Sequence, residues 1–326
     1  MWEVKLMFKF ALKNMAVKKV QLLLVILSIV ISAGVAVLAY NTGSQISDGI
    51  TGNAGYYSAI IGPAGSKTQL AMNTMYFTDE PLGTIPYEIS VELQKDSRVT
   101  EVIPFAMADS YNGYSIVGTT TAYLSGKKVA DGSLFTDGQS MEVVLGSTVA
   151  RVCQVSVGDE IYTNHSASEV HKIPVKVVGI LEETHTVYDT TVFTQLKTIW
   201  ELHEAEEEEE EEEEDHAEMN GMVCAFLVKT QNPSYAMTLT NDYDGKTYTN
   251  DEGSYQLQAI EPMSVVRSVL QDANTTKYVA YVLCGIILIM NIIIISIITL
   301  LNMVHSAREI SLMRLIGISM GRINLL

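Results

Sequence analysis

The chain has 326 residues, of which 48% are hydrophobic and 18% are charged, and its mean hydropathy is +0.19. This composition excludes a disordered chain, and three cysteines are too few for a disulfide-rich scaffold. The net charge of −17 argues against nucleic acid as a partner, because phosphate contacts need clustered cations. The charge is also segregated: residues 1–40 carry +4, residues 41–277 carry −23 and residues 278–326 carry +2.

Two uncharged apolar segments, residues 20–40 and 278–303, separate these three regions. Each has the length of about 20 residues that a helix needs to cross a bilayer, so we expect two transmembrane helices. Cations flank both segments on their outer sides, and the positive-inside rule then places both ends in the cytoplasm and residues 41–277 outside the cell membrane. A cleaved signal peptide is the alternative for the first segment, but signal h-regions are shorter.

Residues 1–19 are predicted to form a cytoplasmic entry helix. Trp2, Leu6 and Phe10 share one helix face, which can lie in the inner interface of the bilayer. The alternative is a simple positive-inside anchor without a mechanical role. In both cases the residues expected at the membrane interface are Lys5, Lys9, Lys13, Lys18 and Lys19.

The middle region, residues 41–277, is expected to be a large α+β domain inserted between the two spans. Residues 41–87 are poorly periodic and predict an entry region followed by short strands. A helix is predicted over residues 89–96. Strands are predicted over 99–107 and 114–118, joined by an Asn112-Gly113 turn that is typical of a hairpin.

A second subdomain is expected over roughly residues 125–230. Strands are predicted over 141–145, 157–161, 173–181 and 223–229, with a helix over 147–153. A last strand over 256–260 leads to a helix from about residue 263, which continues as a stalk into the second span; Pro262 suits its first turn. Residues 304–326 then form a cytoplasmic segment.

Nine consecutive glutamates, residues 206–214, mark the low-complexity part of the chain. Like charges at adjacent positions repel, so we expect a solvated acidic loop over 203–218. A metal-binding role is the weaker alternative, and its candidate ligands are His203, Glu204, Asp215 and His216.

We find no catalytic motif and no phosphate-binding loop, so an enzyme is not expected and no catalytic residue or cofactor is assigned to this chain. His165, His171 and His185 fall in or beside predicted loops, and exposed loop histidines are favoured over a cluster. Cys153 and Cys224 are predicted to be buried small side chains, with a disulfide bridge as the alternative.

The segment after the second span is the most specific part of the sequence. Residues 306–319 read Ser-Ala-Arg-Glu-Ile-Ser-Leu-Met-Arg-Leu-Ile-Gly-Ile-Ser, which resembles the R-E-I-x-x-x-R-x-x-G-x-S signature of MacB/FtsX-type ABC transporter permeases. Residues 145–150 with 157–161, and residues 175–181, resemble motifs of the extracytoplasmic core domain of that family. Members generally have four transmembrane helices, so this chain is expected to stop before the third.

The resemblance implies a permease subunit that pairs with a second permease subunit and with a separate ATPase, which binds ATP and Mg. The expected function is export or extraction of a peptide, lipoprotein or amphipathic compound, driven by movement of the extracytoplasmic domain. The residues expected to couple the chain to the ATPase are Arg308, Glu309, Ile310, Met313, Arg314 and Gly317. Two other functions stay open: a regulator of an extracellular protein partner such as a cell-wall hydrolase, and a membrane-anchored cation sensor.

Overall fold

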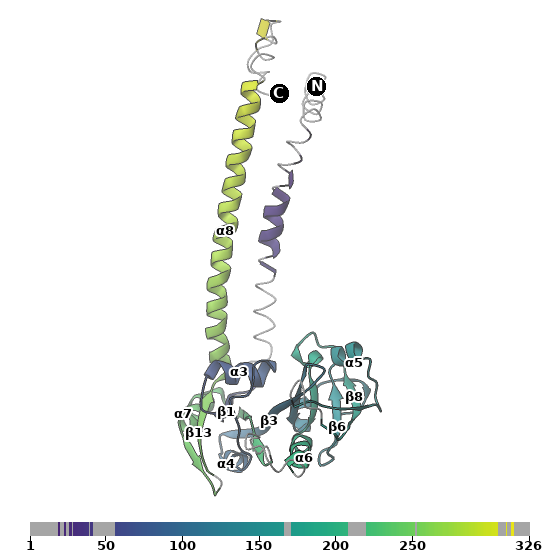
Figure 1. The fold of residues 1–326 in the computed structure, drawn as a ribbon. Helices are drawn as coiled ribbons and strands as arrows, with labels where there is room; N and C mark the ends of the chain where they lie inside the picture. The colour runs from purple at the N-terminus through teal and green to yellow at the C-terminus, as the bar shows by residue number, and fades with distance from the viewer. Residues whose placement is uncertain are drawn as a thin grey trace. The chain divides into compact units, whose positions relative to one another are not determined.

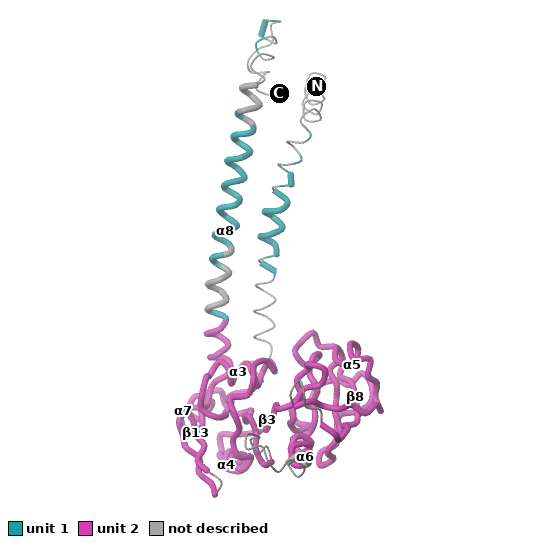
Figure 2. Tube along the Cα trace, viewed as in Figure 1, with its two compact units in different colours: residues 1–47, 270–326 teal, residues 48–269 magenta. Residues whose placement is uncertain are grey.

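The computed structural model describes residues 56–165, 171–207, 220–251 and 253–305, together with residues 29–38 and single helical positions near the two ends of the chain (Figure 1). The chain divides into two compact units. One contains residues 1–47 and 270–326, and the other contains residues 48–269 (Figure 2). The smaller unit holds both apolar segments, and the larger holds the acidic middle region.

The long helix α8, Pro262–His305, has 44 residues and begins at the proline that the sequence places in its first turn. Its segment 281–298 is the one described helix that is long and apolar enough to cross a membrane, and most of its described side chains are exposed. Residues 29–38 form a shorter apolar helix. Its Ser32 hydroxyl accepts a hydrogen bond of 2.5 Å from Asn291 Nδ2 on α8. The second predicted span is therefore a helix, whereas the first is described only in part.

The larger unit is built on an 11-stranded sheet in the order β12-β13-β1-β11-β3-β4-β9-β6-β8-β5, with β7 paired to β8. The pairs β4–β9 and β6–β8 are parallel. A two-stranded sheet pairs β10 with β2. The strands are β1 (Ala59–Pro63), β2 (Ile85–Pro86), β3 (Val99–Tyr111), β4 (Tyr114–Thr119), β5 (Val129–Gly132), β6 (Glu142–Leu145), β7 (Glu160–Ile161), β8 (Val175–Leu181), β9 (Val192–Gln195), β10 (Met222–Val223), β11 (Ala225–Thr230), β12 (Thr247–Thr249) and β13 (Ser254–Ile260).

The predicted hairpin and the strands after it are confirmed, with boundaries shifted by a few residues. Asn112 and Gly113, between β3 and β4, both have positive φ, 49° and 82°, which the tight turn of a two-residue hairpin requires. Strand β8 alternates between buried and more exposed positions, so every second side chain faces the core.

Five α-helices pack with the sheet in the described part of this unit. The helices predicted over 89–96 and 147–153 are confirmed as α4 and α5. Three other helices were not predicted: α3 lies where short strands were expected, the end of α6 lies where the acidic loop was expected, and α7 lies in a segment without a prediction. The ranges are α3 (Lys67–Tyr76), α4 (Ile89–Lys95), α5 (Ser147–Cys153), α6 (Leu196–Glu207) and α7 (Pro233–Tyr243), and two 3-10 turns cover Thr121–Leu124 and Val187–Thr190.

The unexpected helices have identifiable local causes. Ser66 caps α3, because its hydroxyl accepts a hydrogen bond from the Gln69 N–H. Asn232 caps α7 in the same way, and Pro233 occupies its first position. The acidic loop predicted over 203–218 begins later than expected, since α6 continues to Glu207 on the strength of its buried apolar face. The rest of that loop lies outside the described residues.

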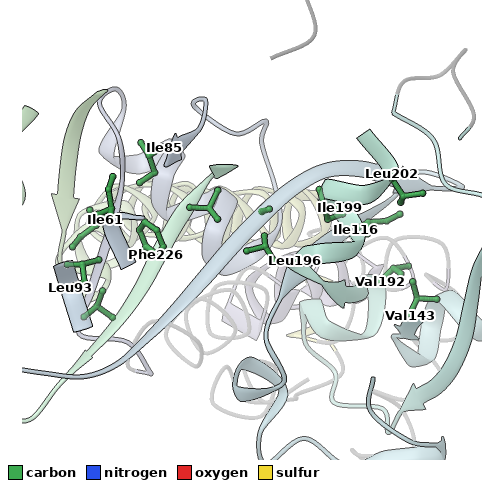
Figure 3. Packing of buried hydrophobic residues seen from close by; sticks show 14 of the residues in the cluster. Ile61, Ile85, Leu93, Ile116, Val143, Val192, Leu196, Ile199, Leu202 and Phe226 are labelled. Carbon is green, nitrogen blue, oxygen red and sulfur yellow. The ribbon is translucent and has the colours of Figure 1, made fainter. Parts of the chain in front are cut away.

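A hydrophobic core lies between the helices and the sheet (Figure 3). Ile61, Leu93 and Phe226 are fully buried where α4 meets the strands, and Ile116 of β4 and Ile199 of α6 are buried where that helix packs on the sheet. Burial of large aliphatic and aromatic side chains is the main stabilising contribution to such a unit. It also fixes α6 against β3 and β4, and this contact positions the site described next.

Candidate functional site

Asp109 is a charged residue inside a buried part of the sheet. It lies on β3 at a β-bulge, because the register between β3 and β4 shifts by one residue between Met107 and Ser110. A bulge locally redirects side chains, and bulges often occur beside functional sites. The side chain of Asp109 is completely shielded from solvent. A carboxylate in this position needs polar or cationic partners nearby.

Two histidines reach Asp109 from the segment before β8. Asn164 forms an isolated antiparallel bridge with Ser110, and both backbone hydrogen bonds of the bridge are 2.8 Å long. The bridge places His165, the next residue, beside Asp109. The backbone N–H of His171 donates a hydrogen bond to the Thr163 carbonyl at 2.8 Å, and this contact places His171 close to Asn164 and His165.

The third histidine comes from α6. Leu196, Ile199 and Leu202 are buried against the strands beneath this helix. His203 follows Ile199 by four positions and Leu196 by seven, so it lies on the same face one turn further along. Its side chain is only 11% exposed. Helix α6 thus places the imidazole of His203 beside Asp109 at the bulge.

All three imidazoles converge on a single oxygen. His171 Nε2 lies 3.1 Å, His203 Nε2 3.2 Å and His165 Nδ1 3.4 Å from Asp109 Oδ1. The three ligand atoms of Asp109, His171 and His203 all lie within 4.8 Å of one another. His171 is almost fully buried, and His165 closes the side nearest to solvent with about a third of its side chain exposed. This group is called the histidine–aspartate cluster below.

The electrostatics of the cluster favour an ionised carboxylate. Burial acts to raise the pKa of Asp109, but the three histidines around it outweigh burial and hold that pKa well below its usual range. Neither carboxylate oxygen accepts a hydrogen bond of acceptable geometry from any residue that the structure describes.

A second group of possible ligands, Glu183, His185 and Asp189, has a different character. The carboxylate of Asp189 accepts hydrogen bonds from the backbone N–H and hydroxyl of Thr184 and from the backbone N–H of His185, at 2.7–2.8 Å. His185 itself is 83% exposed. Asp189 is therefore used to hold its own loop, and the group does not resemble a preformed ligand site.

The metal ligands predicted from sequence are only partly brought together. His203 belongs to the histidine–aspartate cluster, but Glu204 is exposed on α6, and Asp215 and His216 lie outside the described residues. The prediction of exposed loop histidines is wrong for His171, which is buried, and correct for His165 and His185, although His165 joins His171 in the cluster.

The sequence contains one signal that points to Asp109. Phe105, Met107 and Asp109 alternate along β3 and are all buried, so a strand pattern continued past Met107 places a carboxylate on the core face. A buried carboxylate predicts nearby partners, although it does not say which histidines they are.

The cysteines are free thiols, so the alternative of a Cys153–Cys224 bridge is not realised. Cys224 is buried beside β3, where its sulfur accepts a hydrogen bond from the Met107 N–H at 3.4 Å. Burial raises the pKa of the Cys224 thiol to about 11. Such a thiol is a poor nucleophile and a poor metal ligand at neutral pH.

An aromatic pocket is a further feature of this unit. Tyr57, Tyr123 and Tyr188 form its walls, with the rings of Tyr57 and Tyr123 stacked at 6.1 Å. Lys127 Nζ lies 3.7 Å from the centre of the Tyr188 ring, a cation–π contact. Burial raises the pKa of all three phenols, so they remain neutral hydrogen-bonding groups. The pocket combines apolar faces, hydroxyl groups and one cation.

The residues expected to anchor the chain and to contact an ATPase are largely outside the described part of the structure. Of the five anchoring lysines only Lys19 is described, and it is helical and exposed. Of the coupling residues only Arg314 is described, and it too is helical and exposed. Their assigned roles remain predictions.

Comparison with known proteins places this chain in a family. The model of the "MacB-like periplasmic core domain" matches residues 22–236, which is about two thirds of the chain. Among solved structures, the extracellular domain of the noncanonic ABC-type transporter YknZ from Gram-positive bacteria is similar, with 16% identity and a TM-score of 0.38, over 62% of this chain and 99% of that one. No curated protein matches.

The family match defines the class of protein: an ABC transporter permease with an extracytoplasmic core domain. The chain belongs to the MacB-like family, and the predicted resemblance to MacB/FtsX-type permeases is confirmed. Proteins of this family are inner-membrane permeases that work with an ATPase subunit.

Proposed function

We propose that this chain is the permease subunit that couples ATP hydrolysis on a separate ATPase to movement of its extracytoplasmic domain. The observation that carries the proposal is the match of residues 22–236 to a MacB-like core domain, which ends in the sequence before an apolar helix of spanning length. The chain would act as a pair of permease subunits with both of its ends in the cytoplasm. The ATP and Mg would be bound by the partner ATPase.

The route of coupling is supported by α8. The helix runs without interruption for 44 residues, which corresponds to roughly 66 Å at 1.5 Å per residue. It has no proline after its first position, and Gly285 has open space around its α-carbon. Helix kinks need a proline, a bulge or an inserted group, so a continuous helix of this kind can transmit a displacement along its axis.

The proposed cargo is a peptide, lipoprotein or amphipathic compound that is handled outside the membrane. The aromatic pocket supports this class of cargo. Aromatic faces bind apolar groups, and the ammonium of Lys127, which lies over the Tyr188 ring, can pair with an anionic group. Its location in the larger unit fits a substrate that meets the extracytoplasmic domain.

The test is charge reversal in the predicted coupling segment. We expect the double variant Arg308→Glu/Arg314→Glu to lose copurification with the ATPase from detergent-solubilised membranes, and to lose substrate-stimulated ATP hydrolysis. The matched control is Arg151→Glu, which reverses an exposed arginine of the larger unit and should leave both unchanged. Normal ATPase binding and coupling by the double variant would refute the assigned contact.

A further inference from the structure

We propose that the histidine–aspartate cluster is a zinc site, with Asp109, His171 and His203 as its three inner ligands and His165 as the fourth. This assignment goes beyond the proposed permease function, since it concerns a site inside the extracytoplasmic domain. It also replaces the metal-binding alternative centred on the acidic tract.

The spacing of the ligand atoms fits tetrahedral zinc. Zinc binds imidazole nitrogen and carboxylate oxygen at about 2.0–2.2 Å, which places neighbouring ligand atoms of a tetrahedron about 3.3–3.6 Å apart. The three nitrogen–oxygen distances in the cluster are 3.1, 3.2 and 3.4 Å. The distances to Asp109 Oδ1 are thus close to those that a zinc ion requires, and the ligand atoms of His171 and His203 lie within 4.8 Å of each other. His165 lies outside that closely spaced group and would complete the coordination from the Asp109 side.

The donor set selects the class of ion. Three imidazoles and one carboxylate suit zinc and neighbouring divalent transition metals, whereas magnesium and calcium prefer oxygen ligands throughout. None of the groups of possible ligands among the described residues includes a cysteine sulfur, which disfavours copper(I) and iron–sulfur clusters. Zinc is the member of this set that favours four-coordinate tetrahedral sites.

The rival explanation is a hydrogen-bonded cluster in which the histidines stabilise Asp109 directly. It accounts poorly for the geometry, because neither carboxylate oxygen accepts an acceptable hydrogen bond from the described residues. Asp189 shows what such a carboxylate looks like in the same unit, with three donors at 2.7–2.8 Å. Metal ligands direct their lone pairs toward a common point, and this accounts for ligand atoms that gather around Asp109 Oδ1 although that oxygen accepts no hydrogen bond of acceptable geometry from the described residues.

The site would fasten three separate parts of the chain together. Asp109 belongs to β3, His165 and His171 belong to the segment before β8, and His203 belongs to α6. Four protein ligands leave no open position for a substrate, which is the arrangement of structural zinc sites. We therefore assign the ion a structural role: it fixes α6 and the segment before β8 to the central strand.

The first experiment measures metal binding by the full chain in detergent. After treatment with a chelator and its removal, equilibrium dialysis against zinc should give one tightly bound ion per chain. Cobalt(II) should bind competitively with zinc and produce the intense visible absorption of a tetrahedral complex. A chain that binds no zinc tightly, or a cobalt spectrum typical of octahedral coordination, overturns the proposal.

Variants locate the ion within the chain. We expect His203→Gln and Asp109→Asn to weaken zinc binding by at least about 100-fold, the upper end of the loss seen for residues that only support a ligand. The matched control is His185→Gln, which removes an exposed histidine and should leave the affinity unchanged. Should Asp109→Asn fail to fold, His203→Gln provides the same test at a position that is less completely buried.

A second control separates this site from the glutamate tract. Replacement of residues 208–214 by serine should remove weak, salt-sensitive zinc binding but preserve the one tight site. If the replacement abolishes tight binding while His203→Gln does not, the metal is held by the tract and the cluster assignment is wrong. If neither change affects tight binding, the ion lies elsewhere and the assignment is equally wrong.

Discussion

Substitution of Gly118 by alanine tests how closely α6 packs on the sheet. Gly118 is buried on β4, and a β-carbon built at this position lies 2.5 Å from Ile199 Cγ1 and 3.5 Å from Leu196 Cα. Ile199 is fully buried and branched at its β-carbon, so the atom in conflict cannot move aside without shifting the helix. Overpacking of this kind costs about 1–3 kcal/mol.

Thermal unfolding of the full chain in detergent, followed by circular dichroism, measures this cost. The larger unit spans residues 48–269, and in a domain of this size 1 kcal/mol corresponds to about 2–4 °C in Tm. The expected fall in Tm is therefore about 2–12 °C. The matched control is Gly253→Ala, whose new β-carbon meets only the Tyr255 ring at 3.8 Å or more and should leave Tm nearly unchanged.

The same substitution also probes the proposed zinc site. His203 follows Ile199 by one helical turn, so displacement of α6 should move its imidazole relative to Asp109 and weaken zinc binding. A Gly118→Ala chain with the Tm and zinc affinity of Gly253→Ala would refute the argument that close packing of α6 on β4 positions this ligand.

Three further predictions concern other contacts. Asn291→Leu removes the hydrogen bond between the two apolar helices and should destabilise the smaller unit by about 0.6–1.7 kcal/mol, measured by thermal unfolding in detergent. Asp96→Asn should destabilise the fold at neutral pH by about 1–3 kcal/mol, because hydrogen bonds from Arg98 hold the pKa of Asp96 below its usual range. A carboxyl with a lowered folded pKa stabilises above its unfolded pKa of about 3.9, so the difference from wild type in urea unfolding should shrink below that pH. In timed alkylation, half-buried Cys153 should react in the folded chain and Cys224 only after unfolding; simultaneous reaction would contradict the burial of Cys224.

Much of the fold could be predicted because its signals are local. The Asn112-Gly113 turn requires positive φ at two adjacent residues, and few sequences other than Asn-Gly satisfy this at low cost. The boundary of α8 is fixed by Pro262, and its extent by an apolar run without helix-breaking residues. These features depend on neighbours in sequence, so the sequence is sufficient to find them.

The family motif around Gly146 has a physical explanation that only the structure supplies. A β-carbon at Gly146 would lie 2.2 Å from the Tyr188 carbonyl oxygen and 2.5 Å from that of Asp189. The motif therefore marks a close approach between two backbones that are about forty residues apart in the chain. Gly158 of the following motif has φ of +99°, which glycine adopts without strain.

The helices that were not predicted depended on weaker or misleading signals. The capping residue and proline at the start of α7 were present in the sequence, but its apolar face is short: Ala236, Leu239 and Tyr243. The helix α6 runs into the glutamate tract, whose charge pattern favours a loop. Packing of Leu196, Ile199 and Leu202 against the sheet outweighs that repulsion as far as Glu207.

The histidine–aspartate cluster could not be predicted, because its members come from three segments that only the sheet topology brings together. Once the fold brings these residues together, electrostatics explains their arrangement. A carboxylate with no exposure to solvent is costly to bury without a compensating charge. Three imidazoles at 3.1–3.4 Å from one oxygen exceed what a single carboxylate oxygen needs as hydrogen-bond donors. One divalent cation among them would neutralise the carboxylate, accept the nitrogen lone pairs and account for the separations together.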